Sequence, residues 1–437
     1  MIVGLRVLIH RMKRGFYTIM AAQFFSSLAD NALLIAAIAL LIDMAAPEWM
    51  RPLLKLFFTI SYVVLAPFVG AFADSFPKGR VMFVTNTVKV FGCGLLFFHV
   101  HPLAAYAVVG LGAAAYSPAK YGILTELLPA EKLVAANGWI EGTTVGSIVL
   151  GIMLGGALIH PSVSTALLSL DVPQIDTGVD TSAEAAICVV AGIYLIAALF
   201  NLRIPDTGAR YPKQHIHPIL LMRAFWRCNV VLWKDKLGQV SLAVTTLFWG
   251  AGATLQFIVL KWAEVQLGLS LDKAAILQGV VAVGIALGAV AAARFVSLKG
   301  SCRVLILGVL MGLFVPLMTL VSTLDLALPL MVVIGGLAGF FVVPMNALLQ
   351  HRGHVMLTAG HSIAVQNFNE NLNVLIMLGL YALLIHLGLS VNTVIVLFGG
   401  FVALTMAAVM VLYRINRRNN DLDALIAEEK LVGTEHP

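Results

Sequence analysis

Residues 17–42 read YTIMAAQFFSSLADNALLIAAIALLI, an apolar run that carries one acidic residue, Asp30, near its centre. About 20 apolar residues cross the hydrocarbon of a bilayer as an α-helix. An ionised carboxylate at the centre of such a helix costs about 2.5–3.5 kcal/mol. No basic residue occurs within two helical turns of Asp30. The stretch therefore predicts a membrane helix whose acidic group finds its polar partner on another segment.

The rest of the chain has the same apolar character. It has 437 residues, of which 60% are hydrophobic and 11% charged, against about 25% charged in soluble domains, and its mean hydropathy is +0.95. Backbone in hydrocarbon must satisfy its own hydrogen bonds, so each apolar run is interpreted as a helix. We predict an all-α membrane protein with twelve transmembrane helices, at about 17–42, 53–73, 81–99, 102–124, 135–159, 184–202, 239–261, 273–296, 304–323, 326–350, 361–386 and 390–413.

The basic residues predict how the chain is oriented in the membrane. Most of the 28 Lys and Arg residues fall in segments on one side, whereas Arg51, Lys261 and Lys273 fall in loops on the other. Cytoplasmic loops carry the excess of Lys and Arg, so both termini are predicted to be cytoplasmic. This topology accounts for the net charge of +6 without a nucleic-acid partner, because the basic residues form no single stripe.

The longest basic segment divides the predicted helices six from six. It spans 203–238, contains three prolines and includes an amphipathic piece around 219–233, so we interpret it as a cytoplasmic linker. The predicted organisation is two pseudo-symmetric six-helix bundles, 1–202 and 239–413, followed by a cytoplasmic tail at 414–437. This is the architecture of the major facilitator fold.

An internal repeat supports two related halves. Residues 110–122, GLGAAAYSPAKYG, resemble 336–347, GLAGFFVVPMNA, and residues 137–142, NGWIEG, resemble 366–371, QNFNEN. The matched polar positions are Lys120 with Asn346, Glu141 with Glu370, and Asp30 with Gln256. Binding sites of repeat-built transporters lie near the bilayer midplane between the repeats. We expect these polar positions to meet there.

Among the ionisable residues of the predicted helices, five are interpreted as intramembrane charges: Asp30, Lys89, Lys120, Glu141 and Glu370. Such groups usually mark a substrate or ion path. Two of them, Lys120 and Glu141, are near enough to the cytoplasmic interface for snorkelling to explain them. The deeper three have a structural ion pair as their alternative explanation, and Asp30 has either Lys89 or Lys120 as its predicted partner.

Amides complete the predicted substrate site. The run 366–371 is either interhelical glue or a grip for a polar headgroup, and we favour the headgroup. The predicted substrate-binding residues are Asp30, Asn31, Asn86, Lys89, Lys120, Glu141, Gln256, Asn346, Gln366, Asn367 and Glu370.

A predicted gating loop connects the second and third helices. Residues 70–81 read GAFADSFPKGRV, and they resemble the signature loop of the major facilitator superfamily. We expect Asp74 to pair with a neighbouring base, Lys78 or Arg80, when the cytoplasmic side is closed and to separate from it when that side opens.

Other chemistry has little support in the sequence. His351, His354 and His361 have no companion ligands, and we predict that they lie in a solvated loop. There is no phosphate loop for ATP, no acyltransferase signature and no catalytic constellation, so we predict a protein without enzymatic activity or bound cofactor. Coupling to Na⁺ or protons stays open.

Several longer segments, among them YSPAKYG and VVPMNALLQ, make the chain similar to the bacterial lysophospholipid transporter family of the major facilitator superfamily. The resemblance runs over about 17–413. It implies flipping of lysophosphatidylethanolamine and lysophosphatidylglycerol from the outer to the cytoplasmic leaflet of the bacterial inner membrane. It also implies membrane lipids as surroundings and an acyltransferase coupled to an acyl-ACP synthetase as a partner.

Two other functions fit the same residues. A proton-coupled exporter of drugs or metabolites would use Asp30 as its proton site, and a scaffold for the acyltransferase would not transport at all. Lysophospholipid transport fits these residue types, because lysines can bind a phosphate, carboxylates can bind an amine and aromatic residues can contact an acyl tail.

Overall fold

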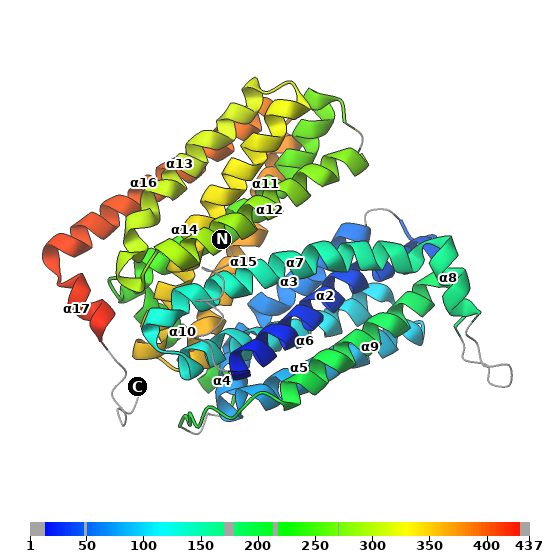
Figure 1. Ribbon diagram of the computed structural model, residues 1–437, viewed down its shortest axis with the longest axis horizontal. Coiled ribbons are helices and arrows are strands. Elements are labelled where there is room, and N and C mark those ends of the chain that lie inside the picture. Colours follow the sequence, from blue (N-terminus) through cyan, green and yellow to red (C-terminus); the bar gives the residue numbers. More distant parts are fainter. Residues whose placement is uncertain (1–13, 48–49, 170–178, 213–216, 270, 429–437) are drawn as a thin grey trace. The chain divides into compact units, whose positions relative to one another are not determined.

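The computed structural model describes residues 14–47, 50–169, 179–212, 217–269 and 271–428, and every regular element among them is a helix (Figure 1). The ends of the chain at 1–13 and 429–437, and part of the loop between the fifth and sixth predicted helices, lie outside the described residues. All twelve predicted segments coincide with a helix or with consecutive helices. The predicted all-α membrane fold is confirmed.

The first six segments are α2 (Arg14–Asp43), the pair α3 (Met50–Val64) and α4 (Ala66–Ser75), α5 (Lys78–Phe97), α6 (Pro102–Leu127), α7 (Leu133–Ile159) and α9 (Ser182–Leu202). The last six are α11 (Gly238–Leu267), α12 (Leu271–Phe295), the series η2 (Leu298–Val304), α13 (Leu305–Phe314) and η3 (Val315–Leu320), then α14 (Leu324–Met356), α15 (Ala359–His386) and α16 (Val391–Asn419). Four short helices lie between or after them, at η1 (Ala130–Lys132), α8 (Pro161–Leu168), α10 (Pro218–Lys234) and α17 (Leu422–Ala427).

Within the described residues, ten spans are long and apolar enough to cross a membrane, and the pair α3 and α4 is an eleventh candidate. The axes of these two helices differ by 66°, and the pair counts as one span when the helices are taken together. The bend falls next to Pro67 in the first turn of α4, where proline has no N–H to donate to the preceding turn. The remaining predicted segment is α6, which has 26 residues and contains Pro118 and Lys120. It is long enough to span the hydrocarbon, at about 1.5 Å per residue.

The chain forms two compact units. Unit 1 comprises residues 1–123 and 146–214, and unit 2 comprises residues 124–145 and 215–437, so the two halves of α7 belong to different units. The core of unit 1 forms where α2 and α5 pack on α9 (Figure 1). Alanines at 29, 32, 36 and 37 of α2 are fully buried there, beside Val190 and Tyr194 of α9. Small residues let the helix backbones approach closely, which favours association in a bilayer.

Glycines play the same part in unit 2. α12 has Gly284 and Gly288 one turn apart, and α14 has Gly335 and Gly339 at the same spacing. A Cβ atom on Gly284 would lie 2.5 Å from the carbonyl oxygen of Val332, and one on any of the other three would meet backbone of the opposite helix. Paired glycines at this spacing are a membrane-helix packing motif. They explain why α12 and α14 lie directly against each other (Figure 1).

Candidate functional site

Unit 1 contains a buried ion pair between Asp30 of α2 and Lys89 of α5. The Lys89 Nζ atom donates to both carboxylate oxygens of Asp30, at 2.8 and 3.0 Å, and to Ser26 Oγ at 3.0 Å. Tyr194 OH of α9 donates to Asp30 Oδ1 at 2.6 Å, and Ser26 Oγ donates to Asn86 Oδ1 at 2.8 Å. We call these five residues the ion-pair cluster. The partner of Asp30, left open between two lysines by the sequence, is Lys89.

The ion-pair cluster is almost completely desolvated. The Lys89 side chain is 1% exposed and its three N–H donors have three oxygen acceptors, so in this conformation it has no free donor for a phosphate. The side chain of Asp30 is 22% exposed and keeps some access to water. Among the described residues, Asn86 Nδ2 is buried without a hydrogen-bond partner. An unpaired buried donor costs about 1–3 kcal/mol, and it is a ready contact for an anionic group.

Unit 2 contains a chain of amides and carboxylates carried by α7, α14 and α15. Asn137 and Gln350 exchange two hydrogen bonds, at 2.8 and 2.9 Å. Asn346 Nδ2 donates to Glu141 Oε1 at 3.4 Å, and its Oδ1 accepts from Gln366 Nε2 at 3.1 Å.

The last hydrogen bond of this series is donated by Gln366 Nε2 to Glu370 Oε1, at 2.8 Å. All six side chains are at least nine-tenths buried. We call this set the amide chain: Asn137, Glu141, Asn346, Gln350, Gln366 and Glu370.

The amide chain links helices and also leaves one acceptor open. Its bonds join α7 to α14 and α14 to α15, so part of the amide run is interhelical glue, as one of the two interpretations expected. Gln366 Oε1, however, is buried without a hydrogen-bond partner among the described residues. It belongs to the same side chain that contacts Glu370. An acceptor beside a carboxylate is suited to an ammonium group.

Asn31, Lys120, Gln256 and Asn367 lie outside these two sets. Asn31 Nδ2 donates to the carbonyl of Ser27 on its own helix at 2.8 Å, and the carbonyl of Asn367 accepts from Asn371 Nδ2. Their roles in binding stay predictions.

Lys120 and Gln256 have aromatic and amide neighbours. Lys120 is half-buried, with its Nζ 4.1 Å from the ring centroid of Tyr121. Gln256 is exposed and pairs with Gln278 of α12, donating to its Oε1 at 3.0 Å. The structure therefore does not place Gln256 in the amide chain of its own unit.

The predicted gating loop has an ion pair between Asp74 and Lys78. Lys78 Nζ lies 2.7 Å from Asp74 Oδ1, with side chains 2% and 0% exposed, and it also donates to the carbonyl of Ala73. The ring of Tyr211, from the linker, lies 4.9 Å from the same nitrogen. Arg80 is exposed, so the base that pairs with Asp74 in this loop is Lys78.

Arg80 faces the linker instead. It contributes to the electrostatic field at Asp206, whose two carboxylate oxygens accept from Arg210 at 3.0 and 2.8 Å. The hydrogen bond from Arg210 lowers the pKa of Asp206 to about 2, so this carboxylate stays ionised at physiological pH. The positive charge of Arg80 thus also favours the ionised form of Asp206 at the start of the linker.

The histidines near 351 contradict the predicted solvated loop. α14 continues to Met356 and α15 begins at Ala359, so His351 and His361 are helical, and each is only 6% exposed. His351 Nε2 lies 3.0 Å from the carbonyl oxygen of Ile426 in α17. The prediction was wrong because the polar residues at this helix end are covered by the C-terminal helix, which the local sequence does not indicate.

Arg352 beside it joins three segments. Its guanidinium donates to both oxygens of Asp235, at 3.1 and 2.7 Å, to the carbonyl of Leu425 at 2.6 Å and to Glu428 at 2.8 Å. The Arg352 and Asp235 side chains are 1% and 6% exposed. The pair fixes α17 and the start of α11 to the end of α14.

Four members of these clusters were not among the predicted substrate-binding residues: Ser26, Asn137, Tyr194 and Gln350. Ser26 and Asp30, and likewise Asn137 and Glu141, are four residues apart and so share a helix face, a spacing that could have identified them. Tyr194 has no such signal, because an isolated tyrosine in an apolar helix is indistinguishable from a packing residue.

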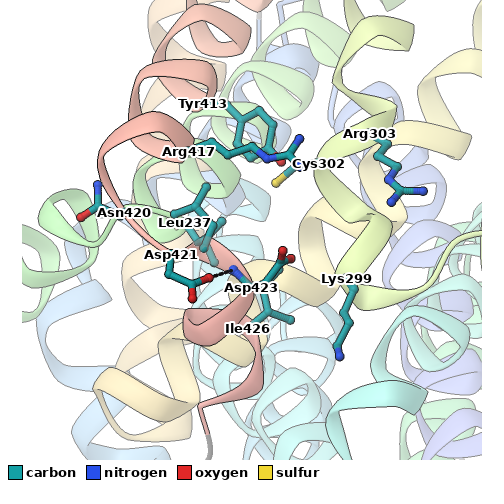
Figure 2. Close-up of a pocket in the computed structure, with 11 residues that line it drawn as sticks. Leu237, Lys299, Cys302, Arg303, Tyr413, Arg417, Asn420, Asp421, Asp423 and Ile426 are labelled. Atoms are coloured by element: carbon teal, nitrogen blue, oxygen red, sulfur yellow. Dashed lines mark hydrogen bonds between the residues drawn. The ribbon is translucent and has the colours of Figure 1, made fainter.

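A separate pocket of about 280 Å³ lies between η2, α16 and α17 (Figure 2). Lys299, Arg303 and Arg417 line it together with Asp421, whose carboxylate caps α17 by accepting from the backbone N–H of Asp423. No predicted substrate-binding residue lines this pocket. It is a mixed-charge surface site at the C-terminal end of the described chain.

Comparison with known proteins agrees with this structure. Residues 52–372 match the Major Facilitator Superfamily. The fold is similar to the crystal structure of the superfamily transporter FucP in its outward conformation, with a TM-score of 0.66 and 13% identity over 92% of this chain and 98% of that one. It is also similar to a bacterial homologue of the iron transporter ferroportin in its outward-facing state, with a TM-score of 0.69 and 14% identity over 93% of this chain and 100% of that one. At these identities the likeness is one of fold alone.

Fold, composition and family match define a multi-pass membrane protein of the Major Facilitator Superfamily, a class of transporters. At higher identity, the chain is 44% identical over 382 residues, 87% of its length and 89% of the relative's, to the lysophospholipid transporter LplT of Yersinia enterocolitica. It is 44% identical over 385 residues, 88% and 90% of the two lengths, to LplT of Yersinia pestis. The chain belongs to the LplT family of this superfamily.

Proposed function

We propose that this protein is a lysophospholipid transporter that moves lysophosphatidylethanolamine and lysophosphatidylglycerol from the outer to the cytoplasmic leaflet of a bacterial inner membrane. The observation that carries the proposal is the 44% identity to LplT over nearly nine-tenths of the chain. The predicted orientation, with both termini cytoplasmic, belongs to the proposal, as does re-acylation of the delivered lipid by an acyltransferase coupled to an acyl-ACP synthetase.

The two polar clusters supply the chemistry that such a headgroup needs. A lysophospholipid presents a phosphate, and in the ethanolamine case an ammonium group. The ion-pair cluster has an open donor at Asn86 Nδ2, which suits a phosphate oxygen. The amide chain has an open acceptor at Gln366 Oε1 beside Glu370, which suits an ammonium group. We propose each open group as a headgroup contact within its own unit.

The ion pairs supply the conformational part of the mechanism. Asp74 and Lys78 form a closed pair in this structure. We propose that this pair, with Arg80 beside it, belongs to the cytoplasmic gate. Separating two buried charges costs several kcal/mol, which sets a threshold that differential binding of the lipid must overcome.

Headgroup-resolved transport tests the proposal. Purified protein in liposomes is assayed for flipping of labelled lysophosphatidylethanolamine and lysophosphatidylglycerol. Gln366→Leu removes the open acceptor, and we expect it to lower ethanolamine-lipid transport about tenfold while the glycerol lipid, which has no amine, falls less. A charge-assisted hydrogen bond of about 1.5–3 kcal/mol gives this magnitude.

Asn371→Leu is the matched control, an amide on the same helix that donates to the Asn367 carbonyl. It should transport both lipids like the unmodified protein. Equal flipping in liposomes with and without the protein would reject lysophospholipid transport. Extrusion of a drug or metabolite that Asp30→Asn abolishes would instead support the proton-coupled exporter.

A further inference from the structure

The linker helix α10 has three different faces along its length of 17 residues, about 25 Å. One face is packed against the protein, a second is apolar and exposed, and a third is basic and exposed. None of the exposed residues of α10 belongs to the gating loop, the ion-pair cluster or the amide chain.

The packed face fixes where α10 lies. Phe225, Asn229 and Leu232, spaced four and three residues apart, are buried. Asn229 Oδ1 accepts from Asn369 Nδ2 of α15 at 2.8 Å, and the ring centroid of Phe225 lies 5.3 Å from that of Phe368.

The connection from α10 to the span α11 places the C-terminal end of α10 near one surface of the membrane. Asn369 lies ten residues into α15, about 15 Å along its axis, and α10 ends three residues before the span α11 begins. α10 also contacts α14. Its C-terminal end therefore lies close to where α11 begins, and its packed face lies along the first half of α15.

The apolar face is a stripe one turn wide. Met222, Trp226, Val230 and Trp233 follow one another at spacings of four, four and three residues, and Met222 and Trp226 are 53% and 57% exposed. Tryptophan favours the boundary between headgroups and acyl chains, because its ring is apolar and its N–H is polar.

A basic stripe runs beside the apolar one. Arg223, Arg227 and Lys234 are exposed, and each directly follows a member of the apolar stripe, about 100° further round the helix. A helix with an apolar face flanked by Lys and Arg is typical of binding to an anionic membrane surface. Phosphate headgroups complement this charge, and acyl chains complement the stripe beside it.

We propose that α10 is an interfacial helix that binds anionic phospholipid of the surrounding bilayer, with Met222, Trp226 and Val230 at the acyl boundary and Arg223, Arg227 and Lys234 on the headgroup phosphates. Its packed face holds it to Phe368 and Asn369, which neighbour Gln366 and Glu370 on α15. The proposal concerns lipids around the protein and stands whether or not lysophospholipids are the cargo.

Tryptophan quenching by brominated lipid tests the immersion of the stripe. The full chain has six Trp residues and is reconstituted in vesicles that contain dibrominated phosphatidylglycerol. Trp226→Phe removes an immersed fluorophore, so the quenched fraction of the remaining emission should fall.

Trp262→Phe is the matched control. Trp262 is fully buried and donates to the carbonyl of Met318 at 2.9 Å, so its removal should raise the quenched fraction. An unchanged or raised quenched fraction for Trp226→Phe, in protein that elutes as a folded species, would overturn the proposal.

Neutralising the basic stripe tests whether it sets the preference for anionic lipid. The triple variant R223Q/R227Q/K234Q should lose the preference for brominated phosphatidylglycerol over brominated phosphatidylethanolamine near Trp226, by about fivefold for each basic residue. The control triple K299Q/R303Q/R417Q removes the same charge from the pocket of Figure 2 and should keep the preference. Equal preference in both triples would refute the basic stripe as the lipid contact.

Discussion

Replacing Lys89 by Met should destabilise the protein by about 3 kcal/mol. The Lys89 ammonium is 1% exposed and contacts both oxygens of Asp30, so the variant leaves an unpaired carboxylate in a nearly dry site. Breaking a buried pair by removing one partner costs about 3–5 kcal/mol. Because the Asp30 side chain is 22% exposed, water recovers part of this loss, and the expected cost lies at the lower end.

Asp30→Asn should cost more, about 5 kcal/mol, since the ammonium left behind is less exposed than the carboxylate was. The double variant D30N/K89M has no unpaired charge and should recover to within about 1 kcal/mol of the unmodified protein. Equilibrium unfolding in mixed detergent micelles measures all four proteins as a double-mutant cycle. If the two groups form one pair, the summed unfolding free-energy costs of the two single variants exceed the cost of the double variant by several kcal/mol.

The exposed pair of Lys261 and Glu264 is the control. Its nitrogen-to-oxygen distance is 2.9 Å, similar to that of the buried pair, but its side chains are 48% and 62% exposed, so Lys261→Met should cost less than about 1 kcal/mol. Desolvation does not explain the cost of breaking the buried pair if the two lysine variants cost the same, or if the costs of D30N and K89M simply add in the double variant. Liposome flux separates stability from function, because the double variant should be stable and still transport poorly.

Three further outcomes follow from the packing. Gly112→Ala should cost about 1–3 kcal/mol in the same unfolding assay, since its Cβ would lie 2.8 Å from the Cγ atom of Lys89; an unchanged midpoint would mean that the helices separate easily. Asp74→Asn weakens the closed gating pair with Lys78, so a cysteine probe beside the loop should react faster, and equal rates would argue against a gate. Arg352→Gln should free the C-terminal helix for limited proteolysis and cost about 3–5 kcal/mol, and an unchanged cleavage pattern would contradict this.

The spans of the fold could be predicted from the sequence because they depend on local properties. An apolar run of sufficient length becomes a helix in lipid whatever its neighbours are, and all twelve runs did so within the described residues. The basic linker likewise predicted the short helix observed as α10. Asp30 and Lys89 could be identified as candidate site residues from the sequence, because a charged side chain within an apolar run has a high desolvation cost.

Which groups touch was decided by tertiary structure. The sequence left Asp30 with two candidate lysines, omitted Tyr194 and placed His351 in water, because hydrogen bonds between helices depend on rotation and depth that no local pattern encodes. The free energy of placing a residue in hydrocarbon depends on that residue's own side chain, so it can be estimated from the sequence. Directional bonds need the atoms of distant segments brought within about 3 Å, and only the packed helices do that.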